Sequence, residues 1–222
     1  MSKTYRLVIF DWEGTLGDTL GHVLTVLADE ARRLNFGEMD ECLARQYVIL
    51  GLARAVKKIF PQLLLHQHEQ LLQAVQHALA ICSTEVCLMP GALQIIKQMD
   101  AVGLKLAIAT NKGHQSLQRA LHVSGLDVFF TVTRAAGQVP AKPCPQMLEE
   151  ILSEFDVPAS QALMIGDSVN DIEMASLIGM DAIGIDFYHL QADELLAAGA
   201  LEVFDDYQQV GKYLRLPEEH SL

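Results

Sequence analysis

The chain has 222 residues, half of them hydrophobic, which is enough to bury a sizeable core in one large domain or in one domain with a small insertion. Lys and Arg total 16 against 28 Asp and Glu, and the resulting net charge of −12 excludes nucleic acid and anionic membranes as expected partners. No apolar run resembles a signal peptide or a membrane span, so we expect a cytoplasmic protein, either a monomer or a homodimer.

The first predicted element is a buried strand at residues 7–10, an apolar run that ends in Asp11-Trp12-Glu13-Gly14-Thr15. Residues 18–85 then predict an almost entirely helical block. Apolar residues recur every three or four positions from Leu20 to Leu34, and further helical stretches cover residues 43–59 and 66–82. Because this block has no strand pattern and follows the first strand, we expect it to be an inserted helical cap.

Strands and helices alternate after Met89-Pro90-Gly91. We expect strands at 104–109, 128–132, 162–165, 181–185 and 201–204, and helices at 116–123, 146–155, 170–178 and 193–198. Such alternation predicts an α/β fold, in which helices cover both faces of a doubly wound parallel sheet. Residues 1–17 and 86–222 would form this core, and residues 18–85 the cap.

Polar residues gather in four short segments that directly follow strands or lie in loops. Since parallel strands end at one edge of a sheet, these segments are expected to meet in a single crevice. The segments are Asp11-Trp12-Glu13-Gly14-Thr15, Thr110-Asn111-Lys112, Lys142-Pro143 and Gly166-Asp167-Ser168-Val169-Asn170-Asp171.

The residue types in these segments suit phosphoryl transfer. Clustered carboxylates repel one another unless a cation is bound, and oxygen ligands favour Mg²⁺, which commonly bridges to a substrate phosphate. Lysine, hydroxyl groups and turn amides can hold phosphoryl oxygens, and a carboxylate can act as a nucleophile. We expect Lys112 to be a solvated charge.

In this order and strand context, the four segments resemble those of the haloacid dehalogenase superfamily of phosphatases. The helical insertion, Pro90-Gly91 after it and Lys142-Pro143-x-Pro145 make the chain similar to the phosphoglycolate phosphatase-like branch, over nearly its whole length. The resemblance implies a Rossmann-like core and a Mg²⁺-dependent enzyme that hydrolyses a small phosphorylated metabolite.

Catalytic and phosphate-binding roles also follow from the resemblance. Asp11 would be the nucleophile, and Glu13 would stand where the family has its general acid/base. Thr110 would hold the transferring phosphoryl group with the backbone of Asn111, and Lys142 would offset the charge of nucleophile and phosphate.

The resemblance implies a Mg²⁺ site as well. Asp11 and Asp167 would bind the ion, the backbone carbonyl of Glu13 would contribute, and Asp171 would support it directly or through water. In the cap, Arg54 could meet a second anionic group of the substrate, although a solvated helix face explains this residue at least as well.

Glu13 departs from the family pattern, which usually has Asp at this position. One extra methylene matters because a general acid must reach the leaving oxygen. The residue could work in a site shaped for it, as enolase-phosphatases of the superfamily carry a similar Asp-x-Glu-Gly-Thr. It could instead give a slow phosphatase, or a protein that only binds phosphate ligands. A phosphomutase of the same architecture would share every motif.

Overall fold

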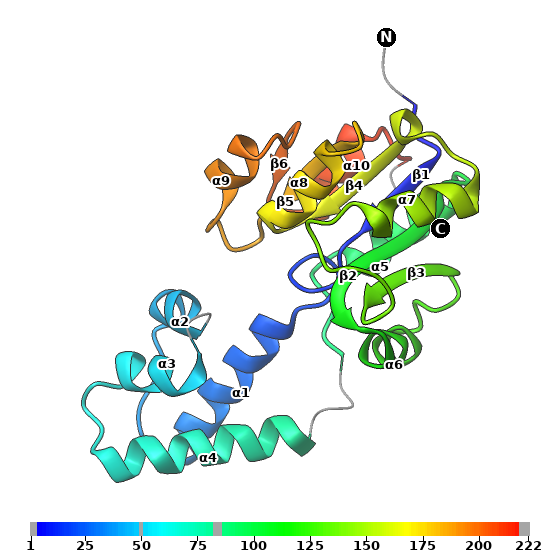
Figure 1. Ribbon diagram of the computed structural model, residues 1–222. Coiled ribbons are helices and arrows are strands. Elements are labelled where there is room, and N and C mark those ends of the chain that lie inside the picture. Colours follow the sequence, from blue (N-terminus) through cyan, green and yellow to red (C-terminus); the bar gives the residue numbers. More distant parts are fainter. Residues whose placement is uncertain (1–3, 49–50, 82–85, 218–222) are drawn as a thin grey trace. The chain divides into compact units, whose positions relative to one another are not determined.

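The computed structural model of the chain describes residues 4–48, 51–81 and 86–217 (Figure 1). These residues form two compact units. One comprises residues 1–17 with 88–222, and the other comprises residues 18–87. The boundary expected after residue 85 falls on residues outside the described ranges. Within those ranges, no helix is both long and apolar enough to cross a membrane.

The larger unit contains a six-stranded, all-parallel sheet in the order β3-β2-β1-β4-β5-β6. The strands are β1 (Leu7–Phe10), β2 (Lys105–Gly113), β3 (Val132–Ala136), β4 (Ala162–Gly166), β5 (Asp181–Ile185) and β6 (Val203–Phe204). Phe10, the last residue of β1, lies opposite Ile108 of β2 and Ile165 of β4. The polar segments that follow β1 and β4 therefore start at the same edge of the sheet, and β2, which continues to Gly113, carries residues 110–112 to that edge as well.

Helices cover both faces of the sheet, which confirms the predicted α/β fold (Figure 1). On one face, Leu7 and Ile9 of β1 share an apolar core with α7, α8 and α9. On the opposite face, α5 packs against β2 and α10 packs against β6 and α5. The helices are α5 (Ala92–Ala101), α6 (His114–Ser124), α7 (Gln146–Phe155), α8 (Val169–Ser176), α9 (Ala192–Ala197) and α10 (Tyr207–Tyr213), with a short 3₁₀ helix at Ala159–Gln161.

The smaller unit contains helices around its own apolar core. They are α1 (Thr19–Arg33), α2 (Glu41–Val48), α3 (Leu52–Ile59) and α4 (Leu65–Ile81). Leu27, Phe60 and Leu71 are completely buried in this core. The single helical stretch expected over 43–59 is instead two helices, α2 and α3, and the expected end of the third helix at Cys82 lies outside the described residues.

Three further differences from the expected elements concern one strand and two helices. The strand expected at 128–132 is wrong, since β3 runs from Val132 to Ala136. The apolar side chain of Phe130 does not join the sheet as a strand residue but packs edge-on against Phe10, with ring centroids 6.1 Å apart. Helices α5 and α10, which cover the face of the sheet opposite α7, α8 and α9, were not predicted.

Candidate active site

Three strand ends bring the predicted acidic and hydroxyl residues together. Asp11 directly follows β1, and its backbone N–H donates to Ile165 O of β4 at 2.9 Å. Thr110 of β2 is buried beside it, and Asp167 directly follows β4. Carboxylate oxygens of Asp11, Asp167 and Asp171 all lie within 4.8 Å of one another. The sheet edge thus gathers three carboxylates from two different segments.

Lys142 occupies the centre of this cluster. Its Nζ donates to Asp11 Oδ1 at 2.6 Å and to Asp171 Oδ1 at 2.5 Å, and its side chain is only 3% exposed. The backbone N–H of Lys142 donates to Asn111 Oδ1 at 2.9 Å, and the peptide bond to Pro143 is cis. At Lys142, the loop before α7 is therefore hydrogen-bonded both to the residue after β1 and to β2.

Asp171 serves the local fold and the cluster at once. Ser168 and Asp171 form a capping box at the start of α8, in which the backbone N–H and the hydroxyl of Ser168 donate to Asp171 Oδ2 at 3.1 and 2.7 Å. The other oxygen of Asp171 accepts from Lys142. With both oxygens engaged, the completely buried Asp171 carboxylate is held in one orientation.

Asp167 is packed against the loop that follows β1. Thr15 Oγ1 donates to Asp167 Oδ1 at 3.2 Å, and Thr15 itself is completely buried. Gly14 has φ +73°, and a Cβ atom there would lie 2.0 Å from Asp167 Oδ2. Only glycine fits at position 14, because the backbone conformation and the close approach both exclude a side chain.

The C-terminal helix α10 also reaches this loop. The hydroxyl of buried Tyr207 donates to the backbone oxygen of Thr15 at 2.6 Å. Burial, followed by the negative charges of Asp167 and Asp11, raises the pKa of Tyr207 well above its usual value. Tyr207 is therefore a neutral hydrogen-bond donor next to the carboxylates.

When its carboxylates are ionised, the cluster carries more negative than positive charge. Burial raises the pKa of Asp11 to about 6, although Lys142 opposes the shift. Burial and the neighbouring charges of Asp11 and Asp171 raise the pKa of Asp167 to about 8. Burial works against the charge on Lys142, but Asp11 and Asp171 outweigh it and raise its pKa. One ammonium group cannot balance the charge of three carboxylates. A divalent ion that prefers oxygen ligands, such as Mg²⁺, would supply the missing positive charge.

Glu13 lies outside this three-carboxylate cluster and forms an ion pair with Lys112 Nζ. The expectation that Lys112 is a solvated charge is therefore wrong, and its side chain is 23% exposed. The backbone N–H of Lys112 also donates to Thr110 Oγ1 at 3.2 Å. Lys112 thus connects the hydroxyl and the acid that the family resemblance assigns to catalysis.

Arg54 lies on α3, in the other compact unit, and its side chain is exposed. It therefore belongs to none of the hydrogen-bonded groups described above. Its part in choosing a substrate remains a prediction.

Tyr207 was missed at the sequence level, and Thr15, Lys112 and Ser168 lay in the predicted segments but were assigned no part in the site. Ser168 could have been found, since a Ser three residues before an Asp at the start of a helix is the pattern of a capping box. The Lys112–Glu13 and Tyr207–Thr15 contacts join residues 99 and 192 positions apart, and no local pattern signals such pairs.

Comparison with known proteins agrees with this geometry. The family model described as haloacid dehalogenase-like hydrolase matches residues 8–185. A phosphoglycolate phosphatase from Rhodospirillum rubrum is 27% identical over 223 residues, which cover 96% of this chain and 92% of that protein.

Solved structures share the fold. A hydrolase of the same family from Deinococcus radiodurans, solved with bound phosphate and sodium, superposes with a TM-score of 0.74 at 19% identity, covering 97% of this chain and 99% of its own. A Thermotoga maritima structure assigned as a β-phosphoglucomutase gives a TM-score of 0.67 at 22% identity, covering 93% and 98%. The chain therefore belongs to the haloacid dehalogenase-like hydrolases, and within them it is phosphoglycolate phosphatase-like.

Proposed function

We propose that this phosphatase hydrolyses a small, phosphoglycolate-like phosphorylated metabolite through an aspartyl-phosphate on Asp11, with Mg²⁺ as its cofactor. The observation that carries the proposal is the buried contact of Asp11 with Lys142, within reach of Asp167 and Asp171. A carboxylate held by an ammonium beside further carboxylates combines a nucleophile with a cation site, and phosphoryl transfer needs both.

In the first half-reaction, a carboxylate oxygen of Asp11 attacks the phosphorus and the bond to the leaving oxygen breaks. Glu13, released from its ion pair with Lys112 and protonated from solvent, gives this proton to that oxygen. In the second half-reaction Glu13 takes a proton from water, the water oxygen attacks the phosphorus, and the bond to Asp11 breaks to release inorganic phosphate. Asp11 and Glu13 thereby return to their starting states.

The neighbouring residues orient the phosphoryl group. Lys142 holds Asp11 at 2.6 Å and offsets the charge that gathers during attack. Thr110 Oγ1 accepts from the backbone of Lys112, and its hydroxyl proton can be donated to a phosphoryl oxygen. The backbone of Asn111 would bind a second phosphoryl oxygen.

Asp11, Asp167 and Asp171, with the backbone carbonyl of Glu13, would hold the Mg²⁺ ion. When bound, Mg²⁺ supplies positive charge to the phosphoryl oxygens and relieves the repulsion among the carboxylates. The acidic, oxygen-only donor set fits this ion.

A turnover assay tests the proposal. The wild-type chain should release phosphate from a panel of phosphorylated metabolites with Mg²⁺ and lose this activity in EDTA. Asp11→Asn should lower kcat by about 1,000-fold or more, because the amide is not a nucleophile. Asp127→Asn, a change of the same type at a partly exposed position outside the cluster, should keep wild-type activity. Full activity of Asp11→Asn, or turnover without metal, would contradict the proposal.

Two alternatives have distinct outcomes. The fold is shared with the structure assigned as a β-phosphoglucomutase, and a mutase would isomerise a sugar phosphate without releasing free phosphate. The second alternative is a protein with impaired acid/base chemistry, since the ion pair of Glu13 with Lys112 must open before Glu13 can act. Such a protein would bind a phosphate mimic tightly and give no turnover.

A further inference from the structure

The hydrogen bond from Tyr207 to Thr15 connects the last helix of the larger unit to the loop after its first strand. Tyr207 begins α10 and is 3% exposed, and its hydroxyl meets Thr15 O at 2.6 Å. Its ring packs at a steep angle on Phe187, with centroids 5.4 Å apart. Contact with Phe187 thus holds the Tyr207 ring in place, and the hydrogen bond to Thr15 O holds its hydroxyl.

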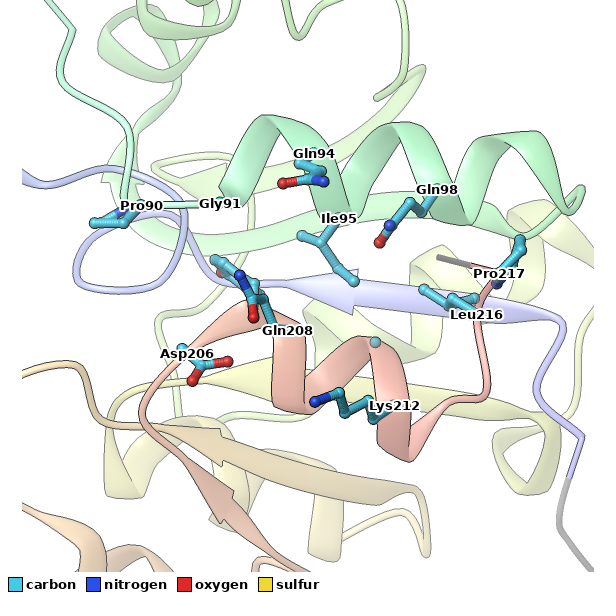
Figure 2. Close-up of a pocket in the computed structure, with 12 residues that line it drawn as sticks. Pro90, Gly91, Gln94, Ile95, Gln98, Asp206, Gln208, Lys212, Leu216 and Pro217 are labelled. Atoms are coloured by element: carbon cyan, nitrogen blue, oxygen red, sulfur yellow. The ribbon is translucent and has the colours of Figure 1, made fainter. Parts of the chain in front are cut away.

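Helix α10, which carries Tyr207, packs alongside α5, and this packing holds the residue in position (Figure 2). A Cβ on Gly211 would lie 3.4 Å from Ile95 Cδ1, and one on Gly91 would lie 3.4 Å from Tyr207 Cβ. The two helices also border a groove of about 490 Å³, into which Ile95 and Lys212 project (Figure 2). Tyr207 also lines this groove, and its hydroxyl donates to Thr15 O.

The loop that receives this hydrogen bond is a compact turn. Leu16 N and Gly17 N both donate to Trp12 O, at 2.9 and 2.7 Å, and Gly14 N donates to Gly17 O at 2.9 Å. In such a turn, fixing the backbone oxygen of Thr15 also fixes the neighbouring backbone and the direction of the Thr15 side chain.

Asp167 is the carboxylate that this turn touches. Thr15 Oγ1 donates to Asp167 Oδ1 at 3.2 Å, and the backbone at Gly14 passes close to Asp167 Oδ2. Both oxygens of Asp167 therefore border the turn, whereas Asp171 is held by Ser168 and Lys142. Of the two acids that follow β4, Asp167 is the one whose position depends on the loop.

We propose that Tyr207 is a positioning residue for the metal-binding carboxylate of Asp167, and that it acts through the backbone of Thr15. The inference rests on the proposed Mg²⁺ site. Groups that hydrogen-bond the ligands of a metal typically contribute about 10- to 100-fold to metal affinity, and Thr15 is such a group for Asp167.

The test is metal affinity of the full chain, measured without substrate. Metal-free protein is titrated with Mn²⁺, the free ion is counted by its electron paramagnetic resonance signal, and Mg²⁺ is added as a competitor. Tyr207→Phe keeps the ring and removes the hydroxyl, and it should weaken binding of both ions by about 10-fold. Tyr213→Phe removes a hydroxyl from the same helix, at a residue that packs on Phe204, and should bind as wild type does. Equal affinity of Tyr207→Phe and wild type would overturn the inference.

A second pair of variants tests the route through Thr15. Thr15→Val keeps the shape but removes the donor to Asp167, so it should also weaken binding, whereas Thr15→Ser keeps the donor and should retain affinity. The double variant Tyr207→Phe/Thr15→Val should have about the same metal affinity as the single variant with the lower affinity. Both changes act on one contact, that of Thr15 with Asp167. Effects that multiply would overturn this route.

Thr15→Val keeps the inference testable if Tyr207→Phe does not fold, because wild-type affinity in Thr15→Val also overturns it. Failure of the wild-type chain to bind Mn²⁺ or Mg²⁺ is a different result. It would refute the Mg²⁺ site itself, together with the proposed cofactor.

Discussion

At the scale of single residues, the ion pair between Glu13 and Lys112 gives a physical reason for a glutamate at position 13. The longer side chain reaches Lys112 on β2, 99 positions away in the sequence. An aspartate would be one methylene shorter and would not span the same gap without a shift of the loop. The pair therefore supports a site built around glutamate.

Glu13→Asp should lower kcat about 10- to 100-fold on the best substrate, since a displacement of about 1 Å in a general acid has an effect of this order. Phosphate release under saturating Mg²⁺ is the measurement. Lys112→Met is the matched variant, because it breaks the same ion pair but leaves the carboxylate in place. A gain in kcat for Glu13→Asp would contradict this prediction and would mean that the glutamate impairs the enzyme.

At the same scale, the sequence indicated which residues approach one another but not how they pair. Asp11, Thr110 and Asp167 were grouped correctly because each directly follows an apolar run, although β2 continues past Thr110 to Gly113. The pairing of Lys142 with both Asp11 and Asp171, and of Lys112 with Glu13, depends on loop paths that no periodicity encodes.

At the scale of elements, the junction of β4 and α8 combines helix capping with site geometry. Ser168 caps α8 through Asp171, and Asp171 in turn holds Lys142. The start of a helix and the position of a buried ammonium group therefore depend on the same carboxylate.

Ser168→Ala should lower the free energy of unfolding by about 1 kcal/mol, because it removes the N-cap hydroxyl of α8. Urea denaturation followed by circular dichroism measures the change. Ser153→Ala, at an exposed position of α7, should change stability by less than about 0.5 kcal/mol. Equal stability of Ser168→Ala and the wild-type chain would show that the capping box does not stabilise α8.

Element prediction succeeded where a pattern is local and failed where distant packing decides the structure. β1, α7 and β5 have the predicted bounds, because apolar runs and helical periodicity are properties of adjacent residues. β3 was misplaced because the apolar segment before it does not extend the sheet. Phe130 of this segment instead packs against the ring of Phe10 in β1. α10 is short and rich in glutamine, and its burial depends on α5, so its own sequence gives only a weak signal.

At the scale of the whole core, the carboxylate cluster makes stability depend on pH and metal. The pKa of Asp11 is raised to about 6 and that of Asp167 to about 8, so the folded chain holds protons that the unfolded chain releases. Stability of the metal-free protein therefore falls as pH rises from the unfolded pKa values near 4 through these folded values.

The melting temperature of the metal-free chain should be lower at about pH 8.5 than at about pH 6, by at least ~3 °C for a protein of this size. Mg²⁺ should raise it more at the higher pH, because the ion replaces the lost protons. Scanning calorimetry with and without Mg²⁺ checks both effects. Asp167→Asn should flatten the dependence on pH, whereas Asp127→Asn should leave it unchanged. A melting temperature that does not change between these pH values would refute the repulsion argument.

The central position of β1 has a consequence for synthesis on the ribosome. All four residues of β1 are completely buried, yet its neighbours β2 and β4 begin only at residues 105 and 162. A nascent chain therefore carries β1 without a partner until β2 has been made, and with one unpaired edge until β4 has been made, a period in which such strands are prone to aggregate. Residues 18–87 have a core of their own and can bury their apolar side chains earlier. The order of translation thus makes the first strand wait longer for its first partner than any other strand of the sheet.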